Sequence, residues 1–264
     1  MPERIHNKGN HYDKLQALMK VLRKECPWDA EQTITSLRRY TLEEVHEVLE
    51  AIDNVEATGD WRPLKAELGD LLLQVAFYAC LAEEADAFDL GDVIDGLIDK
   101  MIYRHPHVFA QTETDDLSRQ WNDLKDSEHK ERESLMDGIP PLPALKYAQK
   151  QQQRAARVGF DWQQASDVIE KMREELDELE FEVRNHADKT RIEDEFGDVL
   201  FTLANLARKL DLDAELSLMH TNRKFGNRFR AMETLASSRN LDMASTPLDE
   251  LEGLYLEAKS SLGK

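Results

Sequence analysis

The chain is poor in several features that would point to particular protein classes. It has only two cysteines, Cys26 and Cys80, so no disulfide framework or cysteine metal motif is available, which fits a reducing cytoplasm. No segment approaches eighteen consecutive apolar residues, and the N-terminus has no apolar signal region. Alternating strand patterns are almost absent. We therefore expect an all-α protein in the cytoplasm.

Positive charge is also scarce. The 264 residues carry a formal net charge of −19, which disfavours duplex nucleic acid and anionic membranes as partners, because both need a basic surface. There is no G-x-x-x-x-G-K-[ST] loop either, so a kinase-like or GTPase-like phosphate site is excluded. Any anionic substrate would have to meet local cations.

Carboxylate pairs at helical spacing are the most informative feature of the second half. Glu175 precedes Glu178 by three residues, and Glu195 precedes Asp198 by three. Residues i and i+3 are neighbours on a helix surface, so each pair forms a small anionic patch. Two apolar stripes with helical periodicity accompany them: Val168, Met172, Leu176, Leu179 and Val183, then Phe196, Val199, Leu200, Leu203, Leu206 and Leu210.

Four converging carboxylates would need a counter-charge. Each close pair repels by about 4 kcal/mol at ~4 Å and an effective dielectric constant near 20. A cation or protonation would have to offset this repulsion. All-oxygen ligands suit Mg2+, which is commonly held by a few carboxylates together with substrate phosphates. The alternative without a metal is an acidic helix face that is simply exposed to solvent, as expected on a highly charged chain.

The same pattern occurs in the first half of the chain. Glu44 and Asp70 precede Glu175 and Asp198 by 131 and 128 positions. Both halves continue to a cationic pair at i, i+4, and both open with a short motif of aromatic and acidic residues. The cationic pairs are Lys100 with Arg104 and Lys224 with Arg228, the opening motifs are C-P-W-D at 26–29 and G-F-D-W at 159–162, and the acids of the second possible site are Glu44, Glu47, Glu67 and Asp70.

Two tandem repeated helical-bundle domains are the economical interpretation. We expect an N-terminal domain over residues 1–135, a proline-containing linker over 136–150 and a C-terminal domain over 151–264. One observation cautions against counting every acid as a ligand. Thr41 precedes Glu44 by three residues, as in a capping box, so Glu44 could instead serve the start of its own helix.

These motifs together resemble the MazG family. The resemblance covers roughly residues 12–260. The motifs that carry it, in chain order within each half, include the duplicated E-E-x-x-E and E-[LF]-G-D pairs, with C-P-W-D, H-P-H-V-F, L-P-A-L, G-F-D-W and K-F-x-x-R-F. The resemblance implies an all-α, Mg2+-dependent nucleotide pyrophosphohydrolase whose helical units dimerise. Its substrates would be nucleoside triphosphates, cleaved to the monophosphate and pyrophosphate, often to clear unwanted nucleotides from the pool.

The resemblance also assigns roles to residues. The second repeat would be the main catalytic unit, and the first would be structural or regulatory. Glu175, Glu178, Glu195 and Asp198 would be metal ligands, and Lys224 and Arg228 would contact substrate. Further contacts are implied near Lys171 to Glu175 and near Arg191 to Asp194. Trp162 is a candidate for stacking on the base, as is Tyr255, which stands where relatives can carry Trp.

Elementary chemistry agrees with this reaction and leaves rivals. A metal-bound water would attack the α-phosphorus, and Glu174, the nearest remaining carboxylate, could take its proton. A di-iron bundle is disfavoured, because it needs two E-x-x-H motifs and the chain has one, at Glu43 and His46. The other alternative is a non-catalytic acidic helical module for interaction or regulation.

Overall fold

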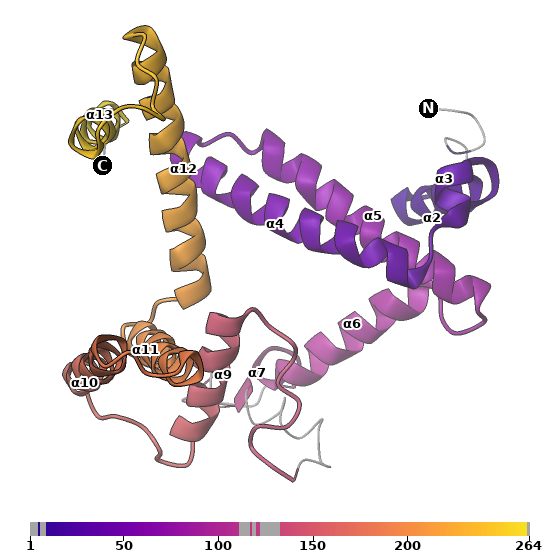
Figure 1. The fold of residues 1–264 in the computed structure, drawn as a ribbon. Coiled ribbons are helices and arrows are strands. Elements are labelled where there is room, and N and C mark those ends of the chain that lie inside the picture. Colours follow the sequence, from indigo (N-terminus) through magenta and orange to yellow (C-terminus); the bar gives the residue numbers. More distant parts are fainter. Residues whose placement is uncertain (1–4, 6–8, 111–116, 118–119, 122–132, 263–264) are drawn as a thin grey trace. The chain divides into compact units, whose positions relative to one another are not determined.

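The computed structural model describes residues 5, 9–110, 117, 120–121 and 133–262. Within these residues the chain forms helices joined by turns and has no β-strand, which confirms the all-α prediction (Figure 1). The chain divides into two compact units, residues 1–128 and 129–264. Each of the two units contains one copy of the repeated acidic motifs.

The first unit is organised around an antiparallel helix pair, α4 and α5, joined by a turn in which Gly59 takes a left-handed φ of 72°. Helix α2 packs on α5, and the shared core includes Met19, Leu37 and Phe77. The helices of this unit are α2 (His11–Glu25), α3 (Pro27–Glu31), α4 (Ile34–Thr58), α5 (Arg62–Glu84), α6 (Leu90–Arg104) and α7 (Pro106–Phe109).

The second unit repeats the helix pair as α10 and α11, with α9 packed on α11 (Figure 1). A separate small core of Met232, Ala236, Leu254 and Ala258 joins α12 to α13. The helices are α9 (Ala144–Ala156), α10 (Ala165–Arg184), α11 (Lys189–Lys209), α12 (Ala214–Ser238) and α13 (Leu248–Ser261). Since α9 begins at Ala144, directly after Pro143, the C-terminal part of the expected linker is helical.

The start of α4 decides the capping question at Glu44. Thr33 caps this helix: its hydroxyl accepts from the Ser36 amide at 3.1 Å, and the Ser36 hydroxyl accepts from the Thr33 amide at 2.9 Å. Glu44 therefore lies in the interior of α4, far from the orphan amides of the first turn. The capping role considered for Thr41 and Glu44 is wrong, so Glu44 remains a candidate metal ligand.

The apolar stripes of α10 and α11 are only partly covered. Val168 is fully buried, but Leu176 is 46% exposed and Val183 is 51% exposed. On α11, Phe196, Leu200 and Leu203 are all exposed. Periodicity predicted a buried face, and the single chain leaves much of that face open to solvent. Among the described residues, no helix is both long and apolar enough to span a membrane.

Candidate functional site

The carboxylates of the second repeat converge from α10 and α11. Each of Glu175, Glu195 and Asp198 offers one carboxylate oxygen, and these atoms lie within 4.8 Å of one another. Glu175 is buried, with 7% of its surface exposed, whereas Asp198 is exposed. The antiparallel pairing of the two helices makes this possible, because it sets the E-x-x-E turn of α10 against the first half of α11.

Glu178 lies at the margin of this cluster. It is exposed and falls outside the set of three, yet its pKa is raised above the ordinary value, by desolvation first and then by the negative charges of Glu175 and Glu195. The Glu178 carboxylate is therefore close enough to the cluster to be repelled by its negative charges. A cation bound there would relieve this repulsion.

Lys171 supplies the counter-charge next to the cluster. Its Nζ lies 2.9 Å from Glu175 Oε1 and donates to Glu174 Oε1 at 2.7 Å. These hydrogen bonds to Glu174 and Glu175 raise the pKa of Lys171. The lysine is one turn before Glu175 on α10, so the helix itself fixes the pairing.

Two hollows include carboxylates of the cluster in their walls. One, of about 790 Å3, is mainly apolar, and Glu175 and Asp198 are among its lining residues. The other, of about 740 Å3, is lined mostly by charged side chains, including Glu178, Glu195 and Arg191. Arg191 forms an ion pair with Glu182, which is buried, and so holds the end of α10 to the start of α11. Asp194 stands exposed beside Glu195 on α11.

The apolar hollow has an anchored aromatic wall. Gly159 takes a φ of +83°, and the following residues Phe160 and Trp162 line the hollow. Between them, Asp161 accepts from Lys209 Nζ at 2.7 Å and pairs with Arg208, both on α11. All three charged side chains are at most 21% exposed. The pairing with α11 fixes the loop that carries the two aromatic rings.

This anchor has a defined pH dependence. Desolvation raises the pKa of Asp161, but hydrogen bonds from Arg208 and Lys209 outweigh it and leave the pKa below its ordinary value. A lowered folded-state pKa stabilises the fold above the unfolded-state value of about 3.9, and this contribution is lost as the pH falls below it.

We expect Asp161→Asn to lower the free energy of unfolding by roughly 1–3 kcal/mol at pH 7, because two cations lose their partner. The loss should shrink as the pH falls below about 4 and vanish only below the lowered folded-state pKa, where the wild-type carboxylate is itself protonated. Urea titrations of both proteins at the two pH values measure this difference. An equal loss at both, or no loss at pH 7, would contradict the assignment.

The remaining residues singled out from the sequence lie elsewhere in the second unit. Lys224 and Arg228 are on α12, and Tyr255 is on α13, where its ring packs 6.0 Å from that of Phe225. None of the three lines either hollow beside the carboxylates. Glu182, Arg208 and Lys209 were not predicted from the sequence. The acid in the G-F-D-W motif, Asp161, was a signal for Arg208 and Lys209 alone, because a buried carboxylate needs a cation nearby.

The first repeat holds a matching acidic cluster. Carboxylate oxygens of Glu44, Glu67 and Asp70 lie within 4.8 Å of one another. The pKa of Glu44 is raised by desolvation and then by Asp70, Glu47 and Glu67; that of Glu67 is raised by desolvation and then by Glu47. The repeats differ beside the cluster: Lys171 has Tyr40 as its counterpart, whose ring packs edge-on against Trp28.

The donor sets suit a hard divalent cation. Each cluster offers three carboxylates from two helices at mutual distances that one ion could bridge, and none of the donors is nitrogen or sulfur. This chemistry favours magnesium or a similar ion over zinc, copper or an iron–sulfur centre. Di-iron proteins of the bundle type need histidine ligands as well, and neither cluster includes one.

Comparison with known proteins places the chain. The MazG nucleotide pyrophosphohydrolase domain matches it twice, over residues 32–109 and 163–231, and each match contains one acidic cluster. A nucleoside triphosphate pyrophosphohydrolase of Escherichia coli K12 is 43% identical over 95% of this chain and 97% of its own length. The nucleoside triphosphate pyrophosphohydrolase/pyrophosphatase MazG of Thermotoga maritima is 42% identical over 95% of this chain and 96% of its own. The chain therefore belongs to the MazG family of nucleotide pyrophosphohydrolases.

Proposed function

We propose that this protein hydrolyses nucleoside triphosphates to the monophosphate and pyrophosphate with Mg2+, water attacking the α-phosphorus. The observation that carries the proposal is the convergence of Glu175, Glu195 and Asp198 within 4.8 Å, between an apolar hollow and a charged one. A nucleotide has the same division, with a flat base at one end and phosphates at the other. The names of the relatives support this substrate class.

Four carboxylates would hold the metal: Glu175, Glu195 and Asp198, joined by Glu178 from the margin. Magnesium bound there would neutralise phosphate charge and lower the pKa of a bound water. Glu175 is held in place by burial and by Lys171, so it needs little reorganisation to serve as a ligand.

Polar side chains around the metal would position substrate and protons. Glu174 lies on the charged hollow with its carboxylate hydrogen-bonded to Lys171, where it could accept a proton from the attacking water. Lys171 would turn towards a phosphate once the metal neutralises Glu175. Arg191, near the start of α11, lines the charged hollow and would bound it on the phosphate side, and Asp194 follows three residues later on the same helix.

Lys224 and Arg228 would hold the leaving phosphates, Arg228 through bidentate contacts. Their position on α12, outside both hollows, means that this contact requires a movement of α12 or the presence of a second subunit. The same holds for Tyr255 on α13, whereas Trp162 already stands in the wall of the apolar hollow.

A homodimer would meet this requirement and would cover the open stripes. Phe196, Leu200 and Leu203 leave an apolar face of α11 in solvent, and Val45 with Leu68 do the same on α4 and α5. Exposed stripes of this length are typical of interfaces rather than of monomer surfaces. We further propose a role in nucleotide-pool clearance in the cytoplasm, with neither nucleic acid nor membrane as partner, in keeping with the charge of −19.

The first repeat would be structural or regulatory. It keeps the acidic cluster, but it has Tyr40 where the second repeat has Lys171, so it lacks the cation that orients the buried glutamate. We expect the double variant Glu47→Gln, Asp70→Asn to retain turnover within about threefold, because loss of two charges relieves repulsion on an exposed face. Steady-state kinetics of the double variant measures its turnover, and size-exclusion chromatography shows whether it is still a dimer. Loss of activity with the dimer intact would place catalysis in the first repeat too.

A panel of ribo- and deoxyribonucleoside triphosphates with Mg2+, with pyrophosphate and orthophosphate quantified separately, tests the proposed function. We expect pyrophosphate and the monophosphate in equal amounts, and no turnover in EDTA. Orthophosphate as the direct product would move the cut to the outer phosphates. Absence of any Mg2+-dependent hydrolysis across the panel would favour the non-catalytic acidic module instead.

A further inference from the structure

Gln152 is half satisfied in the wall of the apolar hollow. This side chain on α9 is 6% exposed and lines the hollow of about 790 Å3 to which Glu175 and Asp198 also contribute. Its Nε2 donates to the Phe201 carbonyl oxygen of α11 at 2.8 Å. A carbonyl can only accept, so this bond fixes which end of the amide is nitrogen. The other end, Oε1, is buried and has no hydrogen-bond partner.

A buried acceptor without a partner is uncommon in folded proteins, and each case asks for an explanation. In the part of the chain that the structure describes, only Gln74 Oε1 and His107 Nδ1 share this condition, and both belong to the first unit. Gln152 Oε1 is thus the one such side-chain atom among the described residues of the second unit, and it belongs to a residue that lines the apolar hollow together with Glu175 and Asp198.

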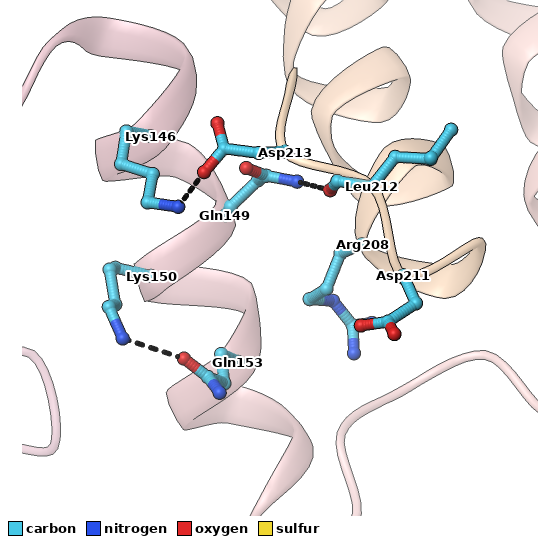
Figure 2. A pocket seen from close by; sticks show the side chains of 8 residues that line it. All are labelled: Lys146, Gln149, Lys150, Gln153, Arg208, Asp211, Leu212 and Asp213. Atoms are coloured by element: carbon cyan, nitrogen blue, oxygen red, sulfur yellow. Dashed lines mark hydrogen bonds and ion pairs between the residues drawn. The ribbon is translucent and has the colours of Figure 1, made fainter. Parts of the chain in front are cut away.

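Gln149, one turn earlier on α9, shows what a purely structural glutamine looks like here. It is 8% exposed, and both ends of its amide are used: Nε2 donates to the Leu212 carbonyl at 2.8 Å, and Oε1 accepts from the Ala214 amide at 3.2 Å. Figure 2 shows Gln149 reaching across to Leu212, beside the ion pair of Lys146 with Asp213. Gln149 ties α9 to the start of α12, while Gln152 has an acceptor left over.

Two other polar side chains of the apolar hollow, Asn205 and Asp161, are already engaged. Asn205 Oδ1 accepts from Arg208 at 2.8 Å, and Asp161 is paired with Arg208 and Lys209. The aromatic rings of Phe160 and Trp162 add flat apolar walls. A ligand with a flat ring and an N–H donor on its edge would match these walls and the spare acceptor of Gln152, with its negative charge towards the metal site.

We propose that Gln152 Oε1 accepts a hydrogen bond from an N–H group on the edge of the nucleobase and that Gln152 thereby sets the base preference of the enzyme. This inference rests on the proposed function, since it places the base of the triphosphate in the apolar hollow. Because Nε2 already donates to the Phe201 carbonyl oxygen, the side chain can act towards a ligand only as a hydrogen-bond acceptor. A base edge that lacks an N–H at this point leaves the buried oxygen unpaired and is bound less well.

The test measures kcat/KM for the preferred triphosphate and for the analogue that lacks its edge N–H. For adenine the analogue is purine riboside triphosphate; for cytosine it is the pyrimidin-2-one riboside triphosphate; for guanine and uracil the ring N–H is replaced by N-methyl. We expect the wild type to disfavour the analogue by about tenfold or more, the usual consequence of an unpaired buried polar group. In Gln152→Met, which keeps the length but removes the acceptor, the ratio should fall to about twofold.

Gln149→Met is the matched control. It removes two hydrogen bonds of α9 and lowers stability, but it should leave the ratio between substrate and analogue at its wild-type value. A ratio that is the same in the wild type and in Gln152→Met would overturn the inference while leaving pyrophosphate release, and so the proposed function, in place. Should Gln152→Met fail to fold, the wild-type ratio decides alone: no discrimination against the analogue overturns the inference. Absence of turnover in the wild type would instead remove the proposed function on which the inference rests.

Discussion

Glu175→Gln is expected to reduce Mg2+-dependent release of pyrophosphate by about a thousandfold or more while the helices remain folded. Glu175 is the most buried member of the cluster, and its oxygens can reach those of both Glu195 and Asp198. The amide keeps the size but removes the charge that a divalent cation needs. Without metal the variant should have a stability close to that of the wild type, because the relief of like-charge repulsion in the cluster offsets the loss of the ion pair with Lys171.

Glu44→Gln makes the same change at the equivalent position of the first repeat and serves as the control. We expect it to keep most of the activity. A second measurement, the unfolding temperature with and without Mg2+, separates metal binding from catalysis. Mg2+ should raise the unfolding temperature of the wild type and of Glu44→Gln, because it binds the folded state, and should raise that of Glu175→Gln less. Full turnover in Glu175→Gln, or equal losses in both variants, would contradict the assignment of catalysis to the second repeat.

Leu203→Arg is expected to convert a dimer into a monomer at micromolar concentration. Leu203 shares a face of α11 with Phe196 and Leu200, and the three are 45%, 53% and 39% exposed in the single chain. Burying each such side chain contributes up to about 2 kcal/mol, and two-fold symmetry counts the contribution twice. An arginine at this place would bury an unpaired charge instead, at a cost of several kcal/mol.

Light scattering coupled to size exclusion measures the change. At 3.6 residues per turn, Leu203 is displaced by roughly 140° around α11 from Asp198, so the substitution does not touch this carboxylate directly. Leu256→Arg, at an equally open leucine of α13 that is 59% exposed, is the control and should stay dimeric. A Leu203→Arg protein that remains dimeric would remove this face of α11 from the interface.

Helical periodicity and the spacing of acids predicted much of the site. The i, i+3 pairs predicted which turn of each helix carries the carboxylates, and the duplication predicted a second cluster; three acids of each set converge. Glu178 lies at the margin although it has the same spacing as Asp198, since both follow their partner by three residues and are displaced from it by roughly 60° around the helix. Local spacing cannot say whether that displacement points a side chain towards the metal or past it.

Other features depended on packing between distant segments and could not be predicted. The direction of α12 decides where Lys224 and Arg228 lie, and no local pattern encodes that direction. Gln152 sits in a polar run of glutamines, in which nothing distinguishes the residue with a spare acceptor from Gln149, whose amide is fully used. The solvent exposure of Leu176 and Leu203 could not be predicted either, because periodicity identifies an apolar helix face but not the segment that packs against it.

Hydrolysis in oxygen-18-labelled water is the most direct test of the central claim, that the carboxylates of α10 and α11 direct water to the α-phosphorus of a nucleoside triphosphate. Mass spectrometry of the products after a single turnover with Mg2+ shows which fragment carries the label. The account predicts one labelled oxygen in the nucleoside monophosphate and none in the pyrophosphate. Label in the pyrophosphate, or in orthophosphate, would show attack at another phosphorus and would contradict it.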